Sequence, residues 1–565
     1  MRTGAEIVWA CLRAEGVDTV FGYPGGAVIP LYDALNASGI RHILTRHEQG
    51  AVFAAEGYAR STGKVGVAIA TSGPGATNLV TGIADAKMDS VPLVCITGQV
   101  RTSLIGTDAF QETDVFGMTM PLTKWSRLVL STDEIPEVVA EAFHIARSGR
   151  PGPVMLDIPV DMLKGKAEVQ IPAAFSPKSQ PRRQHSGADF PAAALRSLLL
   201  SSTKPTAVVG AGVKLAGAHR LLEQLLDRLQ VPTVNTLHGL GALPPEKPYF
   251  LGFVGMHGSR AANVALNEAD LLLVFGARLD DRVTGDPTKF APAARIVHLE
   301  IDPSQLDRVR SYELPIVGDL AKTIPQFGDA VADLALPDWS EWKKTIAELV
   351  SGERAASGMA LPALRFLDEL YALLPANTIL VADVGQHQMW AAQRYRGHSP
   401  RGFITSGGLG AMGFALPGAI GVQLARPDAR VVCISGDGGI QMNIQELATV
   451  RRYALPVKVL IFDNKFLGMV RQWQQLFYNR NYAETDLSDN PDFVTLAAAY
   501  GIHGQRIGID STQPGGLPGN LRSVLKRFLD SPDPELLVFD CPPEANVFPM
   551  VPSGAAISEM LLEEN

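Results

Sequence analysis

Residues 433–443, CISGDGGIQMN, carry an aspartate that stands among glycines directly after an apolar run. The run predicts a buried strand, and Asp437 follows at its carboxyl end. A second run, VKVLIFD, ends just before Asn464. If the two strands are neighbours in a parallel sheet, both side chains leave it at one edge. Two interpretations stay open: a tight turn capped by Asp437, or a site where Asp437 and Asn464 bind Mg²⁺ beside a diphosphate. The pairing with Asn464 favours the second.

Similar apolar runs occur along most of the chain, separated by helical patterns. They lack the polar alternation of a half-exposed strand, so they predict parallel sheets that are covered by helices on both faces. The fold class is therefore α/β. The other predicted strands are residues 66–71, 92–98, 206–210, 271–276 and 296–302.

Two polar segments, residues 172–191 and 351–362, read as linkers. They divide the chain into predicted domains, which are residues 1–165, 190–345 and 363–550, with a tail at 551–565. The first and third domains share an order of strand, glycine-containing loop, helix and strand. We interpret this order as one unit used twice, which predicts a ligand between the two halves.

The composition excludes several function classes. The 565 residues are 46% hydrophobic and 19% charged, with a net charge of -8 and no Lys/Arg run, which argues against a nucleic-acid surface. The four cysteines are scattered, as expected in a reducing compartment. The chain begins with a helical pattern rather than a signal peptide, and no apolar run is long enough to span a bilayer. We expect a cytoplasmic protein without nucleic-acid or membrane partners.

Seven longer motifs carry a family resemblance that covers nearly the whole chain. The chain resembles the catalytic large subunit of acetohydroxyacid synthase (acetolactate synthase), a thiamine diphosphate-dependent family. The motifs are RHEQGAVFAAEGYAR (46–60), ATSGPGATN (70–78), GTDAFQETD (106–114), GARLDDRVTG (276–285), DVGQHQMWAAQ (383–393), SGGLGAMGFALP (406–417) and LGMVRQWQ (467–474).

The resemblance implies a thiamine diphosphate-binding fold with a Rossmann-like central domain. The first domain would bind the pyrimidine, the central domain FAD, and the third domain the diphosphate and Mg²⁺. The implied reaction decarboxylates pyruvate and transfers the hydroxyethyl unit to a second pyruvate or to 2-ketobutyrate, in valine, leucine and isoleucine biosynthesis. Another thiamine diphosphate-dependent 2-ketoacid decarboxylase or oxidase is the alternative, and a non-catalytic binding protein with the same fold is a third reading. The motifs RQWQ and RLDDR argue against the second reading, and the presence of Glu48 and Asp437 argues against the third.

The resemblance also implies catalytic roles. Glu48 would hydrogen-bond the pyrimidine and favour its imino form, while Arg278 would bind the carboxylate of the acceptor. Trp473 would favour 2-ketobutyrate by a modest hydrophobic contribution, ~1–3 kcal/mol. Considered singly, each also fits a plainer role: a helix-start salt bridge, a surface salt bridge, and a core or interface aromatic. The remaining catalytic candidates are Gly26, Phe110 and Gln111.

Cofactor contacts follow from the same resemblance. Met412 would support the bent cofactor, the Gly410 carbonyl would accept its amino group, and Gln386 and His387 would contact the diphosphate. The metal candidates are Asp437, Asn464 and Phe466. Further thiamine diphosphate candidates are Gly385, Gly436, Gly438, Gly439, Gly468 and Met469. The flavin candidates are Arg150, Gly210, Ala211, Gly212, Thr236, Leu237, Met256, His257, Gly276, Arg278, Asp302 and Asp319.

Several properties stay open at this level. The family implies at least a homodimer, since Glu48 and the diphosphate residues would come from different subunits; a tetramer and a separate small regulatory subunit also fit. Val160 stands where many family members carry Lys, which leaves inhibitor sensitivity open. Whether residues 476–493 and 546–565 adopt an ordered structure is open as well. The presence of a flavin motif indicates an anabolic rather than a catabolic enzyme.

Overall fold

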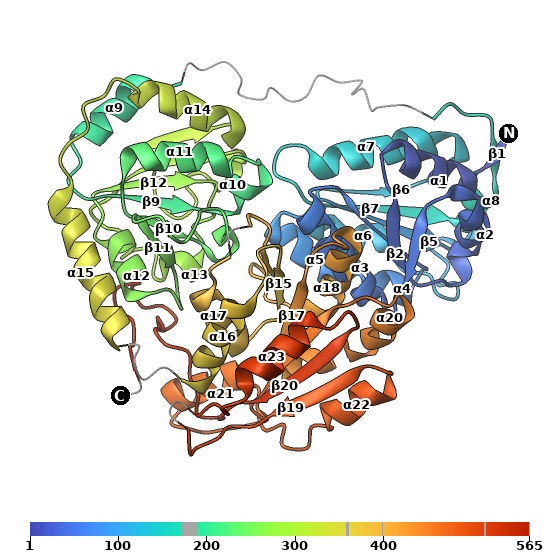
Figure 1. Cartoon of the computed structure of the whole chain (residues 1–565). Coiled ribbons are helices and arrows are strands. Elements are labelled where there is room, and N and C mark those ends of the chain that lie inside the picture. Colours follow the sequence, from blue (N-terminus) through green and yellow to red (C-terminus); the bar gives the residue numbers. More distant parts are fainter. Residues whose placement is uncertain (172–189, 357–360, 398, 514–515, 564–565) are drawn as a thin grey trace.

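The computed structural model describes residues 1–171, 190–356, 361–397, 399–513 and 516–563. Within these residues the chain forms three six-stranded parallel sheets, each flanked by helices, in three lobes (Figure 1). The α/β prediction is therefore confirmed. Most of the predicted linker at 172–191, part of that at 351–362, and the last two residues of the tail lie outside the described residues.

The first sheet belongs to the N-terminal lobe, drawn in blue in Figure 1. Its order is β3-β2-β4-β5-β7-β6, and every neighbouring pair is parallel. The strands are β2 (Thr19–Gly22), β3 (Arg41–Leu44), β4 (Gly66–Ala70), β5 (Leu93–Gln99), β6 (Trp125–Leu128) and β7 (Pro153–Pro159), with β1 (Arg2–Thr3) and β8 (Lys166–Ala167) forming a small antiparallel pair. The helices are α1 (Gly4–Ala14), α2 (Ile29–Ser38), α3 (Glu48–Thr62), α4 (Pro74–Asn78), α5 (Val80–Asp89), α6 (Val115–Thr119), α7 (Ile135–Arg147) and α8 (Val160–Lys164).

The third sheet repeats the topology of the first. Its order is β16-β15-β17-β18-β20-β19, so each sheet reads 2-1-3-4-6-5 when it is numbered from its own first strand. The strands are β15 (Ile379–Ala382), β16 (Phe403–Thr405), β17 (Val431–Gly436), β18 (Lys458–Asp463), β19 (His503–Ile507) and β20 (Glu535–Asp540). The helices are α16 (Pro362–Leu373), α17 (Gln386–Arg394), α18 (Ala415–Ala425), α19 (Asp437–Gln441), α20 (Leu447–Arg452), α21 (Gly468–Phe477), α22 (Phe493–Ala499) and α23 (Leu521–Asp530). The shared order supports the reading of one unit used twice.

The central sheet has a different topology. Its order is β11-β10-β9-β12-β13-β14, which is 3-2-1-4-5-6 in local numbering, the order of a dinucleotide-binding sheet. The strands are β9 (Pro205–Val209), β10 (Thr233–Asn235), β11 (Phe250–Phe253), β12 (Leu271–Phe275), β13 (Arg295–Glu300) and β14 (Leu314–Val317). The helices are α9 (Ala192–Leu200), α10 (Ala211–Leu215), α11 (His219–Leu229), α12 (Arg260–Asn267), α13 (Asp281–Thr284), α14 (Leu320–Val331) and α15 (Ser340–Ala356).

One predicted boundary differs from the structure. Helix α15 continues to Ala356, through the first part of the segment read as a linker at 351–362. The buried side chains of Trp342 and Ile346 pack α15 against the central domain near Ala265, and the helix propagates from that contact through Ser351 and Gly352. The remaining domain boundaries stay predictions.

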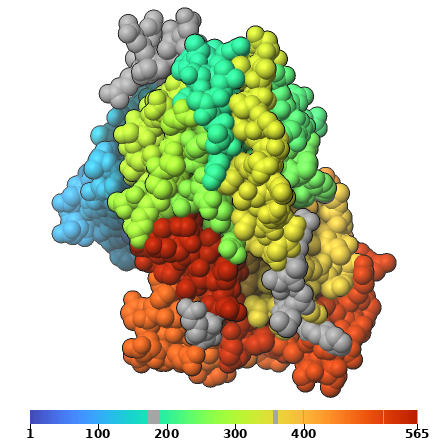
Figure 2. Space-filling view, turned by 90° about the vertical axis from the view of Figure 1, so that its left-hand side faces the viewer, coloured from blue at the N-terminus to red at the C-terminus, as the bar shows by residue number. Residues whose placement is uncertain are grey.

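The tail after β20 crosses from the third domain to the central one. The Val551 N–H donates to the Met256 carbonyl (2.9 Å), and Ala556 forms a bridge with Gly285. Figure 2 shows these red C-terminal residues against the central domain. The described part of the tail is therefore packed against two domains.

Candidate active site

Strands β17 and β18 bring two of the three metal candidates, Asp437 and Asn464, to one sheet edge. The strands are parallel neighbours, with Gly436 opposite Phe462, so Asp437 and Asn464 both leave at the carboxyl end. Burial, followed by the nearby charge of Asp463, raises the pKa of Asp437 to about 7. Asn490 donates to Asp437 Oδ2 (2.9 Å). This edge lies beside the strand pair β15–β17, where the strand order reverses and where ligands bind in open α/β sheets.

Helix α17 begins at the same edge. Its first residues, Gln386 and His387, are buried, and Gln386 Oε1 accepts from Asn464 Nδ2 (3.2 Å). Burial lowers the pKa of His387 to about 3, so the ring is neutral. His387 Nε2 is buried and has no hydrogen-bond partner among the described residues. A buried polar atom without a partner fits a site that is completed by a ligand.

The glycines of this edge make room for neighbouring side chains as well as for a ligand. A Cβ at Gly436 would stand 2.9 Å from the His387 ring, and one at Gly439 would stand 3.1 Å from the Asp383 carboxyl carbon. A Cβ at Gly468 would overlap the Gln386 side chain. The GDGG turn therefore depends on protein packing at Gly436 and Gly439.

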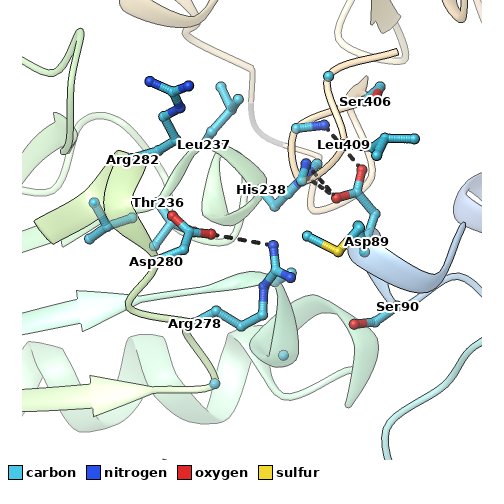
Figure 3. A pocket seen from close by; sticks show the side chains of 18 of the residues that line it. Asp89, Ser90, Thr236, Leu237, His238, Arg278, Asp280, Arg282, Ser406 and Leu409 are labelled. Atoms are coloured by element: carbon cyan, nitrogen blue, oxygen red, sulfur yellow. Dashed lines mark hydrogen bonds and ion pairs between the residues drawn. The ribbon is translucent and has the colours of Figure 1, made fainter. Parts of the chain in front are cut away.

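One cavity of about 940 Å³ lies where the three domains meet (Figure 3). Its volume is at the upper end of the ~300–1,000 Å³ range of small-molecule sites. Residues from all three domains line it, including Arg150 of the first domain. The predicted site residues in its lining are Arg150, Ala211, Gly212, Thr236, Leu237, Met256, His257, Gly276, Arg278, Asp319, Gly385, Gly410, Met412, Met469 and Trp473.

The central-domain wall of the cavity is shaped by close backbone contacts. The Gly212 N–H donates to the Gly276 carbonyl (2.9 Å), and Gly276 has a φ of 55°, where a side chain would be strained. Gly210 and Asp302 do not line the cavity; Gly210 is packed against Gly276, and Asp302 forms an ion pair with Arg150 (3.6 Å). These contacts lie at the carboxyl ends of the neighbouring strands β9 and β12, where the strand order of the central sheet reverses.

Arg278 lies in this cavity with a carboxylate beside it. Its Nη2 is 3.3 Å from Asp280 Oδ2, so the ion pair of the plainer interpretation is present. Burial raises the pKa of Asp280, and the charge of Arg278 opposes that shift. Figure 3 shows the guanidinium extending between Asp280 and the first domain.

The first-domain candidates form a separate cluster. Glu48 begins α3, is buried, and accepts from Asn78 Nδ2 through Oε2 (2.9 Å). Residues 71–75, which lead from β4 into α4, connect Glu48 with Gln111: a Cβ at Gly75 would be 3.4 Å from Glu48 Oε1, and one at Gly73 would be 2.8 Å from the Gln111 carbonyl. Ala27, next to Gly26, donates its N–H to Thr71 Oγ1 (3.2 Å). None of Gly26, Glu48, Phe110 and Gln111 lines the cavity, and Phe110 is 89% exposed.

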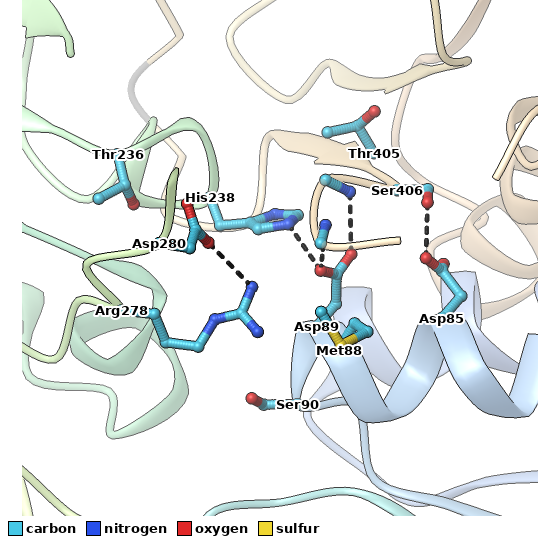
Figure 4. A network of polar contacts seen from close by, with 12 residues as sticks. Asp85, Met88, Asp89, Ser90, Thr236, His238, Arg278, Asp280, Thr405 and Ser406 are labelled. Carbon is cyan, nitrogen blue, oxygen red and sulfur yellow. Dashed lines mark hydrogen bonds and ion pairs between the residues drawn. The ribbon is translucent and has the colours of Figure 1, made fainter. Parts of the chain in front are cut away.

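The sequence interpretation missed a buried polar network beside the cavity (Figure 4). Asp89 contacts His238 Nε2 (2.9 Å) and Arg60 Nη2 (2.8 Å), and Asp85 contacts Ser406 Oγ (2.5 Å). Asp85 and Asp89 lie one turn apart on α5. Two acids at that spacing on a helix with buried apolar neighbours are the sequence signal that was available.

Among the described residues, no group of three or more His, Cys, Asp or Glu side chains could hold a metal ion. None of the helices described combines the length and the apolar composition of a membrane span.

Comparison with known families assigns three segments of the chain. Residues 2–118 match "Thiamine pyrophosphate enzyme, N-terminal TPP binding domain", residues 192–327 match the "central domain" of these enzymes, and residues 383–539 match the "C-terminal TPP binding domain".

Curated relatives align over the full length. "Acetolactate synthase isozyme 2 large subunit" of Escherichia coli (strain K12) is 48% identical over 558 residues, covering 99% of both chains. "Acetolactate synthase large subunit" of Parasynechococcus marenigrum (strain WH8102) is 44% identical, covering 99% of this chain and 91% of the relative. "Acetolactate synthase isozyme 1 large subunit" of E. coli is 43% identical, with 99% and 98% covered.

Proposed function

The chain belongs to the family of acetolactate synthase large subunits, and we propose that it decarboxylates pyruvate and joins the remaining two-carbon unit to a second 2-ketoacid. The acceptor would be pyruvate, giving 2-acetolactate, or 2-ketobutyrate, giving 2-aceto-2-hydroxybutyrate. The observation that carries the proposal is that Met412, Trp473 and Arg278 line one cavity. A cofactor support, an apolar wall and a carboxylate-binding cation together fit a carboligase.

The third-domain edge fits thiamine diphosphate and Mg²⁺. Asp437 and Asn464 offer hard oxygen ligands, and the diphosphate would complete the octahedron that Mg²⁺ requires. A cation there would offset the cost of burying the Asp437 carboxylate. His387 would meet the diphosphate through the nitrogen that has no partner in the described chain.

When bound, thiamine diphosphate supplies an acidic thiazolium carbon that adds to the 2-keto group and accepts the electrons released on decarboxylation. Glu48 would hold a proton at the pyrimidine ring nitrogen. Asn78 already occupies its Oε2, which leaves Oε1 for that contact. Met412, in the lining of the cavity, would support the bent cofactor.

The acceptor would bind between Arg278 and Trp473. The planar guanidinium of Arg278 suits a carboxylate and would exchange its partner Asp280 for the substrate. The Trp473 indole, on α21, gives the larger 2-ketobutyrate side chain an apolar contact.

FAD fits the central domain. The 3-2-1-4-5-6 strand order, the close backbone at Gly212 and Gly276, and a cavity that extends past Arg150 suit a dinucleotide. The purified protein should therefore show flavin absorbance, and released flavin should be detectable after denaturation. Protein that is colourless after growth and purification with added riboflavin would contradict the FAD assignment.

A second copy of the chain would complete the site. The Glu48 cluster lies outside the cavity that holds Met412, so one chain presents two half-sites. Phe110 and Phe116 expose large apolar side chains on the same domain as Glu48. A homodimer that places the Glu48 cluster of one chain against the Met412 cavity of the other would bury them; a tetramer would repeat the arrangement.

A separate small subunit is a further proposed partner. The support is that the aligned relatives are themselves named large subunits. Activity should then rise when an acetolactate synthase small subunit is added.

The direct test incubates the protein with thiamine diphosphate, Mg²⁺, FAD and pyruvate, with and without 2-ketobutyrate. Acid converts acetolactate to acetoin, which is detected by colour. Colour from the wild type, with a large loss in Glu48→Gln, supports the synthase. Release of acetaldehyde or peroxide without acetolactate would favour the decarboxylase or oxidase instead.

A further inference from the structure

The glycine-rich loop 406–412 forms the cavity wall between Arg278 and Met412. It follows β16 and leads into α18, so it belongs to the third domain. Two carboxylates of the first domain, Asp85 and Asp89 on α5, reach across and hold it (Figure 4). Neither carboxylate has a role in the function proposed above.

Asp89 holds the beginning of the loop. Its Oδ1 accepts from the Gly408 N–H (2.7 Å), and its Oδ2 accepts from the Gly407 N–H (3.1 Å). Burial raises the pKa of Asp89, but the charges of His238 and Arg60 outweigh burial and hold it well below its usual range. The carboxylate is therefore ionised, and its oxygens contact groups of all three domains: Arg60 of the first, His238 of the central and the loop N–H groups of the third.

Asp85 holds the end of the loop through Ser406. The Ser406 hydroxyl donates to Asp85 Oδ1 (2.5 Å) and accepts from the Ala411 N–H (2.8 Å). Ala411 directly precedes Met412. The Ser406 hydroxyl thus connects Asp85 on α5 to Ala411, the neighbour of the residue that would support the cofactor.

The loop contacts of Asp89 and of Ser406 lie beside different parts of the site. A Cβ at Gly408 would stand 2.6 Å from Asp89 Oδ1 and 3.0 Å from Arg278 Nη2, so the Gly408 backbone fills the gap between these side chains. Moving Gly408 would move the surface against which Arg278 rests. Moving Ala411 would instead move Met412.

We propose that Asp89 and Ser406 are positioning residues with separate effects: Asp89 sets the acceptor side of the cavity through Gly408 and Arg278, and Ser406 sets the cofactor side through Ala411 and Met412. This inference rests on the roles proposed for Arg278 and Met412. It adds that the first domain controls both through one helix of the same chain.

The test compares Asp89→Asn with Ser406→Ala in the full-length protein. The Asn amide has one acceptor oxygen and cannot serve both loop N–H groups, while Ala removes the link to Ala411. Loss of one hydrogen bond to a charged group corresponds to about a tenfold change in an equilibrium constant. Asp89→Asn should raise the KM for 2-ketobutyrate about tenfold and leave the thiamine diphosphate Kd nearly unchanged. Ser406→Ala should raise the thiamine diphosphate Kd about tenfold and leave the KM for 2-ketobutyrate nearly unchanged.

Thiamine diphosphate Kd is measured by cofactor-induced change in tryptophan fluorescence, which needs no turnover. Gly408→Ala is the second acceptor-side variant, because its added Cβ disturbs the same contact from the loop side while the Asp89 carboxylate is kept, and it should reproduce the KM effect. Separation of the two effects supports the inference. Equal changes in both quantities, or changes in thermal stability alone, would overturn it while leaving the synthase intact; a wild type that makes no acetolactate would overturn both.

Discussion

Trp473 shows what one side chain contributes at the cavity wall. Its ring lies 5.6 Å from that of Phe477 in an edge-on arrangement, and the indole also lines the cavity. Replacing it with Leu should lower the ratio of 2-aceto-2-hydroxybutyrate to acetolactate about tenfold, because a lost apolar contact of this kind is worth ~1–3 kcal/mol. The ratio is measured by chromatography at equal concentrations of pyruvate and 2-ketobutyrate. Phe477→Leu, which leaves the indole in the cavity, should keep the wild-type ratio.

Asp437 is the second residue whose role can be isolated. Removing Mg²⁺ with a chelator should abolish activity, and added Mg²⁺ should restore it. Asp437→Asn keeps the size of the side chain but removes its charge, so the Mg²⁺ concentration for half-maximal thiamine diphosphate binding should rise about tenfold or more. Fluorescence titration measures this value. An unchanged Mg²⁺ requirement would place the metal elsewhere.

At the scale of elements, the crossing of α3 and α18 connects the first and third domains. Helix α3 begins at Glu48, and α18 follows the loop that carries Met412, so this contact relates the two clusters within one chain. The crossing is close: a methyl group at Gly421 would overlap the Ala54 carbonyl, and one at Gly57 would overlap the Gly418 carbonyl.

Gly421→Ala should therefore destabilise the protein by about 2–3 kcal/mol, since the overlap is with backbone that has no room to shift. Gly328→Ala, on α14, is the matched control because nothing lies within 4 Å of its added Cβ. There the same substitution should stabilise by ~0.5–1 kcal/mol through helix propensity. Thermal unfolding midpoints at one scan rate measure both, and the shifts should have opposite signs.

The pairing of β5 with β7 gives a pH dependence. Thr97 lies opposite Asp157 and donates to its Oδ1 (2.7 Å), and Gln99 donates to Oδ2 (2.9 Å). Burial raises the pKa of Asp157 to about 7. The folded state then binds more protons than the unfolded state between pH ~4 and ~7, so this group's contribution to stability falls as pH rises through that window. The free energy of unfolding of Asp157→Asn minus that of the wild type should therefore increase from pH ~4 to pH ~7. A difference that stays constant over this range would contradict the raised pKa.

Elements differ in how far the sequence determines them locally. The runs around Val432 and Leu460 are continuously apolar, and each became a buried parallel strand as predicted. The segment at 351–356 was misread because Ser and Gly suggest a linker, whereas the packing of Trp342 and Ile346 keeps it helical. The contacts of Asp89 with His238 and Gly408 join residues far apart in the sequence, so the spacing of Asp85 and Asp89 could mark the two acids but not their partners.

For the whole molecule, the important feature is that the Glu48 cluster and the cavity lined by Met412 are separate within one chain. The Glu48 cluster lies at the point where the strand order reverses in the first sheet, and Asp437 lies at the equivalent point of the third. Because the two sheets share one topology, a twofold axis between two chains can place each cluster opposite its complement. The contacts between domains within a chain, at α5 and at α3, then fix the distance between the two half-sites.

This arrangement predicts complementation between inactive variants. Glu48→Gln and Asp437→Ala should each abolish activity alone. In a mixed dimer, one site receives both lesions and the other receives neither. If the chains pair at random as isologous dimers, co-expression should restore about a quarter of wild-type activity. Differently tagged variants, purified through both tags, would give about half the wild-type activity because every dimer is then mixed. Inactive dual-tag dimers that still bind thiamine diphosphate would mean that Glu48 and Asp437 act within one chain, and the half-site arrangement would be wrong.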